Sequence, residues 1–218
     1  MAPGGLISVF GTQLSPVNLA TSELPLPTAL ANSCLSVNGL PVPILFVSPD
    51  QVNAQLPYQA FGDVTLVLRT PGGQSNSFNL VIQPNAPSVF LSGTAGPEDN
   101  IPTVVRNDDN ELVTPSHPIH RKSNTALVIY LTGLGPTSPA VGTGQPGPFS
   151  PLALSVTQPT VTLGGVDLPV LFSGLAPGLV GVDQIDVSVP VNVPDGMSVP
   201  LVITQGAISN SIPERVVD

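Results

Sequence analysis

Residues 35–46 read LSVNGLPVPILF, and residues 161–172 read VTLGGVDLPVLF. In both stretches, a short run that alternates apolar and polar side chains is followed by a turn dipeptide and a second apolar run. Alternation with a period of two is typical of strands that bury one face. Asn-Gly and Gly-Gly favour two-residue hairpin turns because both tolerate positive φ. The two stretches therefore predict one β-hairpin that occurs twice in the chain.

The similarity extends to both sides of this hairpin. After a seven-residue insertion in the later copy, the match resumes with QVNAQLP over QIDVSVP and continues to a shared Ser-Asn-Ser. Such ordered coincidence indicates an internal repeat rather than a shared composition. The paired positions are residues 7–10 over 127–130, 51–57 over 184–190, Gly62 over Gly196, 66–67 over 201–202 and 75–77 over 209–211.

The repeat predicts an all-β fold made of two tandem Ig-like β-sandwich domains. We expect the first domain at residues 1–86 and the second at 87–218, with a longer N-terminal hairpin or loop insertion in the second. The boundary falls in QPNAP (83–87), where two prolines interrupt strand pairing. A barrel is the structural alternative, and prolines break every candidate helix.

Composition excludes several classes of function. The chain has 218 residues, 27 Pro, 21 Gly, a hydrophobic fraction of 41% and a net charge of −9 with only five Lys and Arg. Nucleic-acid binding needs a basic stripe, which is absent. No apolar run approaches the length of a membrane span, so no membrane insertion is expected. Residue 1 is followed at once by turn residues, so no signal peptide is expected.

The segments GLISVFGTQLSP, LPTALANSCLSVNGLPVPILFVSPDQVNAQLPY, YLTGLGP and GLAPGLVGVDQIDVSVP carry a family resemblance. They resemble the uncharacterised C-terminal domain of large secreted proteins of Solibacter-type acidobacteria, which is similar to the IPT/TIG branch of Ig-like folds. The resemblance implies an extracellular module without assigned catalytic residues. It also implies that the chain is either an excised terminus or a small free-standing subunit.

Two segments offer metal-binding residue types. His117 and His120 have H-x-x-H spacing, but Pro118 argues against the helix that this spacing needs, so an exposed loop is expected. The segment from Asn107 to Glu111 is acidic enough for calcium. It lacks the Gly and late Glu of a calcium-binding helix-loop-helix motif, and a turn explains the same residues. We therefore predict no metal and no cofactor, with calcium at this turn left open.

Catalytic patterns are weak, and no enzyme is expected. No serine lies in a G-x-S-x-G elbow, and the Asp183 and Asp186 pair corresponds to Asp50 and Asn53 in the first copy, so the pair is not repeated. Gln51 and Gln184 do match between the copies; a buried amide bonded to the backbone of a neighbouring loop is expected there.

Sugar stacking and disulfide formation have few candidate residues. With no Trp and only Tyr58 and Tyr130, a flat sugar platform is not expected, and Tyr130 is predicted to pack in the core. A polar cleft stays open. The single cysteine, Cys34, aligns with Thr160 on the polar face. It is either partly exposed and able to form an intermolecular bridge or a shielded thiol.

The sequence leads to a non-catalytic, secreted or cell-surface structural or adhesive module. We expect partners among other protein domains or copies of itself. Polysaccharide binding through loops is the alternative. Residues 126–131 and 199–203 are strongly apolar, and such strands at sheet edges would pair with other chains unless prolines such as Pro200 block them. The loop from Thr137 to Thr160 is expected to cover an edge or to reach a neighbour.

Overall fold

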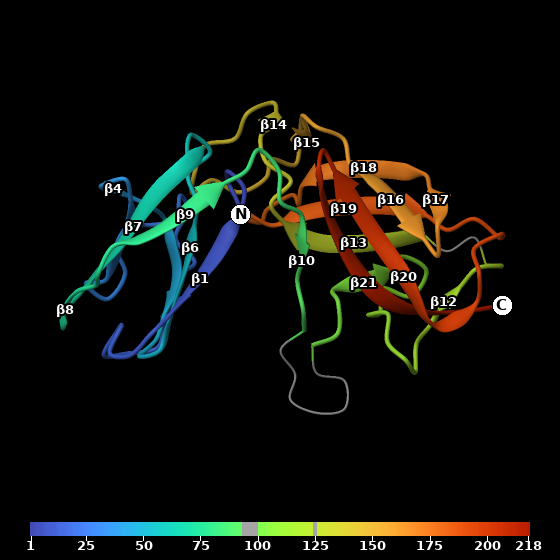
Figure 1. Ribbon diagram of the computed structural model, residues 1–218, viewed down its shortest axis with the longest axis horizontal. Helices are drawn as coiled ribbons and strands as arrows, with labels where there is room; N and C mark the ends of the chain where they lie inside the picture. The colour runs from blue at the N-terminus through green and yellow to red at the C-terminus, as the bar shows by residue number, and fades with distance from the viewer. Residues whose placement is uncertain (93–99, 124–125) are drawn as a thin grey trace.

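The computed structural model describes residues 1–92, 100–123 and 126–218. Those residues form strands, turns and irregular segments and include no helix, as the alternation and the prolines predict. The chain folds as two tandem Ig-like β-sandwiches that lie side by side (Figure 1). We call residues 1–86 the first half and residues 87–218 the second half.

The first half is a sandwich of two antiparallel sheets, with strand orders β1-β6-β5-β2 and β4-β3-β7-β8, where β9 also pairs with β7. Its strands are β1 (Leu6–Phe10), β2 (Leu19–Ala20), β3 (Cys34–Val37), β4 (Leu40–Pro41), β5 (Ile44–Val47), β6 (Gln51–Gln55), β7 (Gly62–Thr70), β8 (Gly73–Gln74) and β9 (Phe78–Ile82).

The second half repeats this arrangement with additions. Its sheets have the orders β10-β13-β19-β18-β15-β14, with β11 also on β13, and β12-β21-β20-β16-β17. Its described strands are β10 (Ser88–Val89), β11 (Val104–Arg106), β12 (Ile119–His120), β13 (Ala126–Thr132), β14 (Thr137–Ser138), β15 (Leu154–Ser155), β16 (Thr160–Leu163), β17 (Val166–Leu168), β18 (Val170–Leu175), β19 (Asp183–Ser188), β20 (Gly196–Gln205) and β21 (Ile208–Val217).

Strand registers confirm the internal repeat at the level of single residues. Phe10 lies opposite Gln51 in the β1/β6 pair, and Tyr130 lies opposite Gln184 in the β13/β19 pair. A β-bulge interrupts β5 between Ile44 and Phe46, and the equivalent bulge interrupts β18 between Val170 and Phe172. Equivalent residues therefore take equivalent places in the two sandwiches.

The repeated hairpin has the predicted turn. Asn38 and Gly39 have φ values of 50° and 80°, and Gly164 and Gly165 have 60° and 82°. Two consecutive residues with positive φ are what a tight hairpin turn of the primed type requires, since its twist matches that of the flanking strands. The turn thus sets the β3/β4 and β16/β17 registers.

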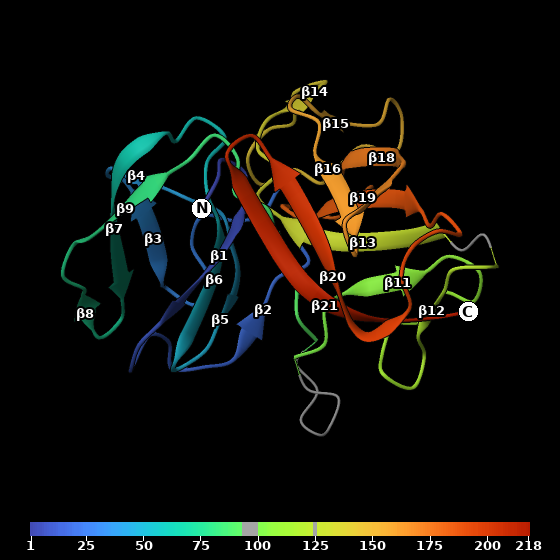
Figure 2. The same cartoon turned by 45° about the vertical axis from the view of Figure 1, so that its right-hand side comes forward.

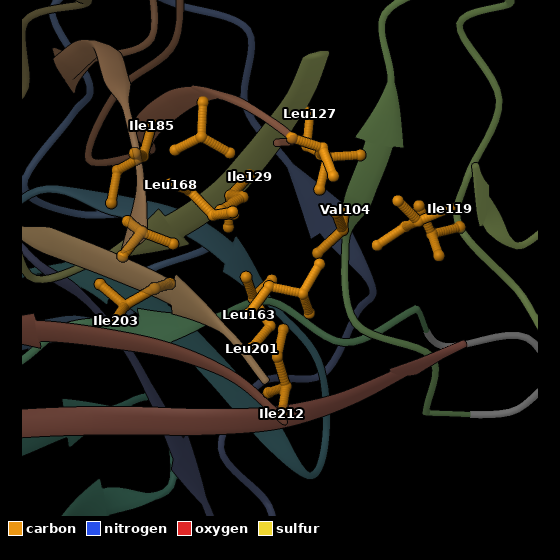
Figure 3. Packing of buried hydrophobic residues seen from close by; sticks show 14 of the residues in the cluster. Val104, Ile119, Leu127, Ile129, Leu163, Leu168, Ile185, Leu201, Ile203 and Ile212 are labelled. Atoms are coloured by element: carbon orange, nitrogen blue, oxygen red, sulfur yellow. The ribbon is translucent and has the colours of Figure 1, made fainter. Parts of the chain in front are cut away.

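Each half has a hydrophobic core of its own. In the first half the core lies between the two sheets and includes the fully buried Ile44, Val52 and Leu56. Figure 3 shows the core of the second half, to which Ile129 on β13 and Leu201 on β20 contribute from opposite sheets. Each of the four sheets is confined to one half. That each half folds when expressed alone stays a prediction.

The apolar strands predicted as exposed edges occupy other positions, which corrects that prediction. Residues 126–131 lie in β13, with β19 on one edge and β10 and β11 on the other. Residues 199–203 lie in β20 between β16 and β21. Their continuous apolar character reflects a central position in a sheet rather than an edge that can pair with another chain.

Pro200 also has another role than blocking an edge. It lies in the central strand β20 opposite Pro213, and its carbonyl accepts a hydrogen bond from the amide of Gly164 at 2.9 Å. The last pair between β16 and β20 is Leu163 with Leu201, so Pro200 lies just beyond the paired residues. Proline is tolerated there because no strand pairing with β16 needs its missing N–H.

The loop from Thr137 to Thr160 covers a sheet edge, which is one of the two alternatives expected of it. Its strands β14 and β15 extend the sheet beyond β18 and cover that edge. Between them, the loop turns back to the first half, where the carbonyl of Gly144 accepts a hydrogen bond from the amide of Leu26 at 2.9 Å. The loop therefore also contacts the first half of the same chain, and contact with another chain stays a prediction.

Candidate functional site

The junction between the halves contains a buried amide, Gln55, at the end of β6. This side chain is fully buried. Its Nε2 donates to the carbonyl of Gly4 at 3.0 Å, and its Oε1 accepts from the amide of Gly144 at 2.6 Å. A buried amide with both ends paired holds two loops in one geometry, because breaking either bond leaves an unpaired polar group inside the protein. Gln55 therefore ties the first half to the loop of the second.

A threonine hydroxyl makes a second bridge across the junction. Thr132 Oγ1 accepts from the amide of Leu6 at 2.9 Å and donates to the carbonyl of Gly181 at 2.9 Å. Gly181 has a φ of 66°, and a Cβ there would lie 2.6 Å from Leu6 Cδ2, so the contact needs glycine. Gly181 belongs to the seven-residue insertion of the later copy, which thus forms part of the junction.

The connection between the halves packs into the same junction. Asn85 is buried, and its Nδ2 donates to the carbonyl of Leu134 at 2.9 Å. The amide of Ala86 donates to the carbonyl of Gly133 at 2.9 Å. A Cβ on Gly133 would lie 2.3 Å from the carbonyl oxygen of Ala86. The predicted proline linker is therefore held by hydrogen bonds as well as by its prolines.

Asp183 is the buried carboxyl group beside this network. Its Oδ2 accepts from the amide of Leu134 at 2.8 Å, and burial raises its pKa to about 7. Burial and the negative charge of Asp183 together raise the pKa of Tyr58. Asp186 alternates onto the opposite face of β19, so the two carboxylates do not converge. Asp183 and Asp186 therefore do not form an acid–base pair.

The acidic turn, Arg106 and His117 form a cluster of charged and polar side chains. The turn from Asn107 to Glu111 is confirmed: the amide of Arg106 donates to the carbonyl of Glu111 at 2.9 Å. The Arg106 guanidinium lies 3.0 Å from Asp108 and 2.8 Å from Asp109, and its hydrogen bond lowers the pKa of Asp108. His117 Nε2 lies 3.0 Å from Glu111 Oε2.

The two histidines occupy different kinds of structure. His117 closes a turn with Thr114, while His120 belongs to β12, which corrects the single exposed loop expected for H-x-x-H. The fully buried Ile119 between them fixes this strand. Among residues 1–92, 100–123 and 126–218, no three His, Cys, Asp or Glu side chains are placed together to bind a metal.

The repeated glutamines have side-chain partners, which corrects the loop-backbone role expected for them. Gln51 Nε2 donates to Asn53 Oδ1 at 2.7 Å, and Gln184 Nε2 donates to Asp186 Oδ1 at 2.7 Å. Both pairs lie on half-buried outer faces. Gln55 has the role that was expected of Gln51. In the sequence, Gln55 differs from Gln51 because its counterpart in the later copy is Ser188 and not another glutamine.

The structure places the two tyrosines and Cys34 outside the hydrophobic cores. Tyr130 lies on the outer face of β13 and is half-buried, so the prediction that it packs in the core is wrong. Tyr58 packs against Gly4, where a Cβ would lie 2.1 Å from its ring. Cys34 is a free, half-buried thiol on the polar face of β3, as its alignment with Thr160 predicts.

Comparison with known proteins identifies no family. No protein-family model matches the sequence, and no curated protein matches it. Five solved chains match the fold. One is the crystal structure of the I9–I11 tandem from titin, with 10% identity, a TM-score of 0.25 and coverage of 99% of this chain and 61% of that chain. A similarity this low carries no argument, and the fold class rests on the strand topology above. None of the described residues forms a helix long and apolar enough to cross a membrane.

Proposed function

We propose that this chain is a non-catalytic structural module of the bacterial exterior that holds or spaces attached protein parts in a set orientation. The observation that carries the proposal is the junction, where Gln55, Thr132 and Asn85 connect the two sandwiches through buried hydrogen bonds. Tandem domains move relative to one another by default when their interface is small and open. A paired, buried network opposes that motion.

The setting of this role is part of the proposal. Secretion or display at the cell surface is supported by the resemblance to the terminal domains of acidobacterial secreted proteins. The partners that we propose are other protein domains or copies of the same chain. The net charge of −9 with five basic residues agrees with a partner that is neither nucleic acid nor an anionic membrane surface.

The second candidate function is binding of a polysaccharide or another polar ligand. A hollow of about 440 Å³ lies on the outer face of β3 and β7 in the first half. Polar groups from Asn38, Thr65, Arg69 and Gln74 line it, together with Cys34. Binding on a glycan array that is lost in Arg69→Ala would favour this function over the structural one.

Small-angle X-ray scattering of the full chain tests the structural role. We expect one two-lobed shape whose distance distribution stays the same between low and high salt. Gln55→Leu removes the paired amide from the junction and should broaden that distribution. Gln51→Leu is the matched control, because Gln51 lies at the other end of the same strand and donates to Asn53 rather than to a loop at the junction. A wild-type profile that requires many orientations of the two halves would refute the proposal.

A further inference from the structure

The first half has an open apolar groove between two unpaired sheet edges. β1 ends one sheet and β9 ends the other, and no strand within residues 1–92, 100–123 or 126–218 pairs with their outer edges. The groove between them has a volume of about 440 Å³. Its lining is mainly apolar and includes Ile7, Val9, Leu66, Leu68, Phe78 and Leu80.

Large side chains at the rim of the groove are exposed to solvent. Phe10 is 73% exposed and Phe78 is 64% exposed. Isolated exposed apolar residues are ordinary, but a contiguous apolar hollow beside two sheet edges marks a site where another element can bind. Met1 also lines the groove, so the N-terminal end of the chain lies at this opening.

The second half shows what closes the equivalent opening. There β11 pairs with β13, the counterpart of β1, and β12 pairs with β21, the counterpart of β9. These added strands place Val104 and Ile119 in the core, both fully buried (Figure 3). The repeat thus supplies a structural template for the missing closure of the first half.

Backbone groups at the two openings correspond as well. Phe10 is the counterpart of Tyr130. In the second half, the amide of Tyr130 donates to Thr103 at 3.0 Å and its carbonyl accepts from Phe90 at 3.1 Å. In the first half, the carbonyl of Gly5 accepts from the amide of Leu56, and the amide of Gly11 donates to the carbonyl of Asp50. The alternation of an antiparallel ladder therefore turns the N–H and C=O of Ser8 and Phe10 outward.

We propose that this groove binds an extended β-strand from another polypeptide, with alternating apolar side chains like those of β11. The strand would pair with the outward backbone groups of β1 and insert its apolar side chains between the sheets. This inference rests on the proposed structural role and names the partner of the module as a donated strand.

A second copy of the chain fits the groove less well than a donated strand. Pairing of two β1 edges would extend a sheet. The inward side chains of the incoming β1, Ile7 and Val9, would remain in the core of their own sandwich. The hollow would then stay unfilled, whereas a donated strand fills it as Val104 and Ile119 fill the second half.

The test is amide hydrogen exchange of the full chain with a synthetic peptide of residues 100–121, which carries β11 and β12. We expect the peptide to slow exchange at Ser8 and Phe10 by about tenfold or more, with β13 unchanged because its edge is already paired. The control peptide carries Val104→Asp and Ile119→Asp and should give no protection.

Two variants on β9 separate the groove from general effects. Phe78→Glu places a charge at the rim and should weaken peptide binding about tenfold or more. Val81→Glu, on the outward face of the same strand, should leave binding unchanged.

Three results would overturn the proposal: no protection at β1, protection at β13 in its place, or closure of β1 by a concentration-dependent dimer without peptide. Because scattering reports the junction and exchange reports the groove, failure of this inference is distinguishable from failure of the structural role.

Discussion

The two halves share their strand registers, their hairpin turn and their bulge. They differ at the opening between the two sheets, which lies between β1 and β9 in the first half and between β13 and β21 in the second. In the second half, β10, β11 and β12 cover that side, and Val104 and Ile119 complete the core. In the first half, the same side is an apolar groove with Phe10 and Phe78 exposed at its rim. Figure 2 shows β11 and β12 beside the second sandwich. Among the residues that the structure describes, no strand pairs with the outer edge of β1 or of β9.

This difference shows that the strands that close the second half are not part of the repeat. The shared strands produce two sheets and a core, but closure needs a further segment that does not belong to the repeated pattern. The halves also differ in buried carboxyl groups. Glu214 on β21 is buried, while its register counterpart on β9 is Leu80. Closure and sensitivity to pH therefore occur together in the second half.

The largest expected effect comes from opening the closed half. Ile119→Ala removes a fully buried side chain from the segment that closes the second sandwich. We expect the free energy of unfolding to fall by about 3 kcal/mol, since the cavity cannot collapse fully. Val9→Ala, at the open groove, should cost less than about 1 kcal/mol. Guanidinium titrations of both variants measure this, and equal losses would contradict the comparison.

The next prediction concerns the junction that both halves share. Gln55→Leu leaves the carbonyl of Gly4 and the amide of Gly144 without their partner. We expect a loss of about 2 kcal/mol, from the cost of burying unpaired polar groups. The variant should also separate the melting transitions of the two halves in calorimetry. Gln51→Leu serves as the control, and an unchanged single transition in Gln55→Leu would show that other contacts hold the halves together.

Stability against pH should distinguish the halves. Burial raises the pKa of Glu214 from 4.5 to about 8, so the folded protein keeps a proton that the unfolded chain releases above about pH 4.5. The stabilisation is therefore full below that pH and is lost as the pH rises to 8. Asp183, with a pKa raised to about 7, acts in the same direction.

Thermal melts between pH 5 and 8 measure this difference. Asp108 and Asp218 have lowered pKa values, from hydrogen bonds with Arg106 and with Lys122 respectively, and they titrate below this window. Glu214→Leu, the residue found at the counterpart position, should make the fall in stability shallower, by up to about 1.4 kcal/mol per pH unit. A wild-type stability that rises with pH across the window would contradict the assignment.

The smallest expected effect is at Cys34. This residue and Thr160 occupy the same position on the polar faces of β3 and β16. Cys34→Thr should change the free energy of unfolding by less than about 0.5 kcal/mol, because the site is half-buried and outside both cores. Sedimentation with and without reductant shows in the same samples whether Cys34 forms a bridge between chains.

Much of the fold is predictable from the sequence because it depends on local signals. Alternation defines the strands, positive-φ dipeptides define the turns, and the internal repeat alone pairs Phe10 with Tyr130. The candidate site is predicted less well. The repeat points to Gln51, whereas the amide that joins the halves is Gln55, which does not repeat. A junction between two copies is asymmetric, so its residues cannot be found by looking for matches between the copies.

The sequence by itself determined the all-β class, the repeat and the shared turns, because each follows from residues close together in the chain. Only the tertiary structure decided which strands lie at an edge. Residues 126–131 and β1 are both largely apolar, yet residues 126–131 lie at the centre of a sheet and β1 lies at an edge. Edge position depends on whether a distant segment arrives to pair, and on the loop-closure entropy that its contacts must offset. Neither is written in the alternation of the strand itself.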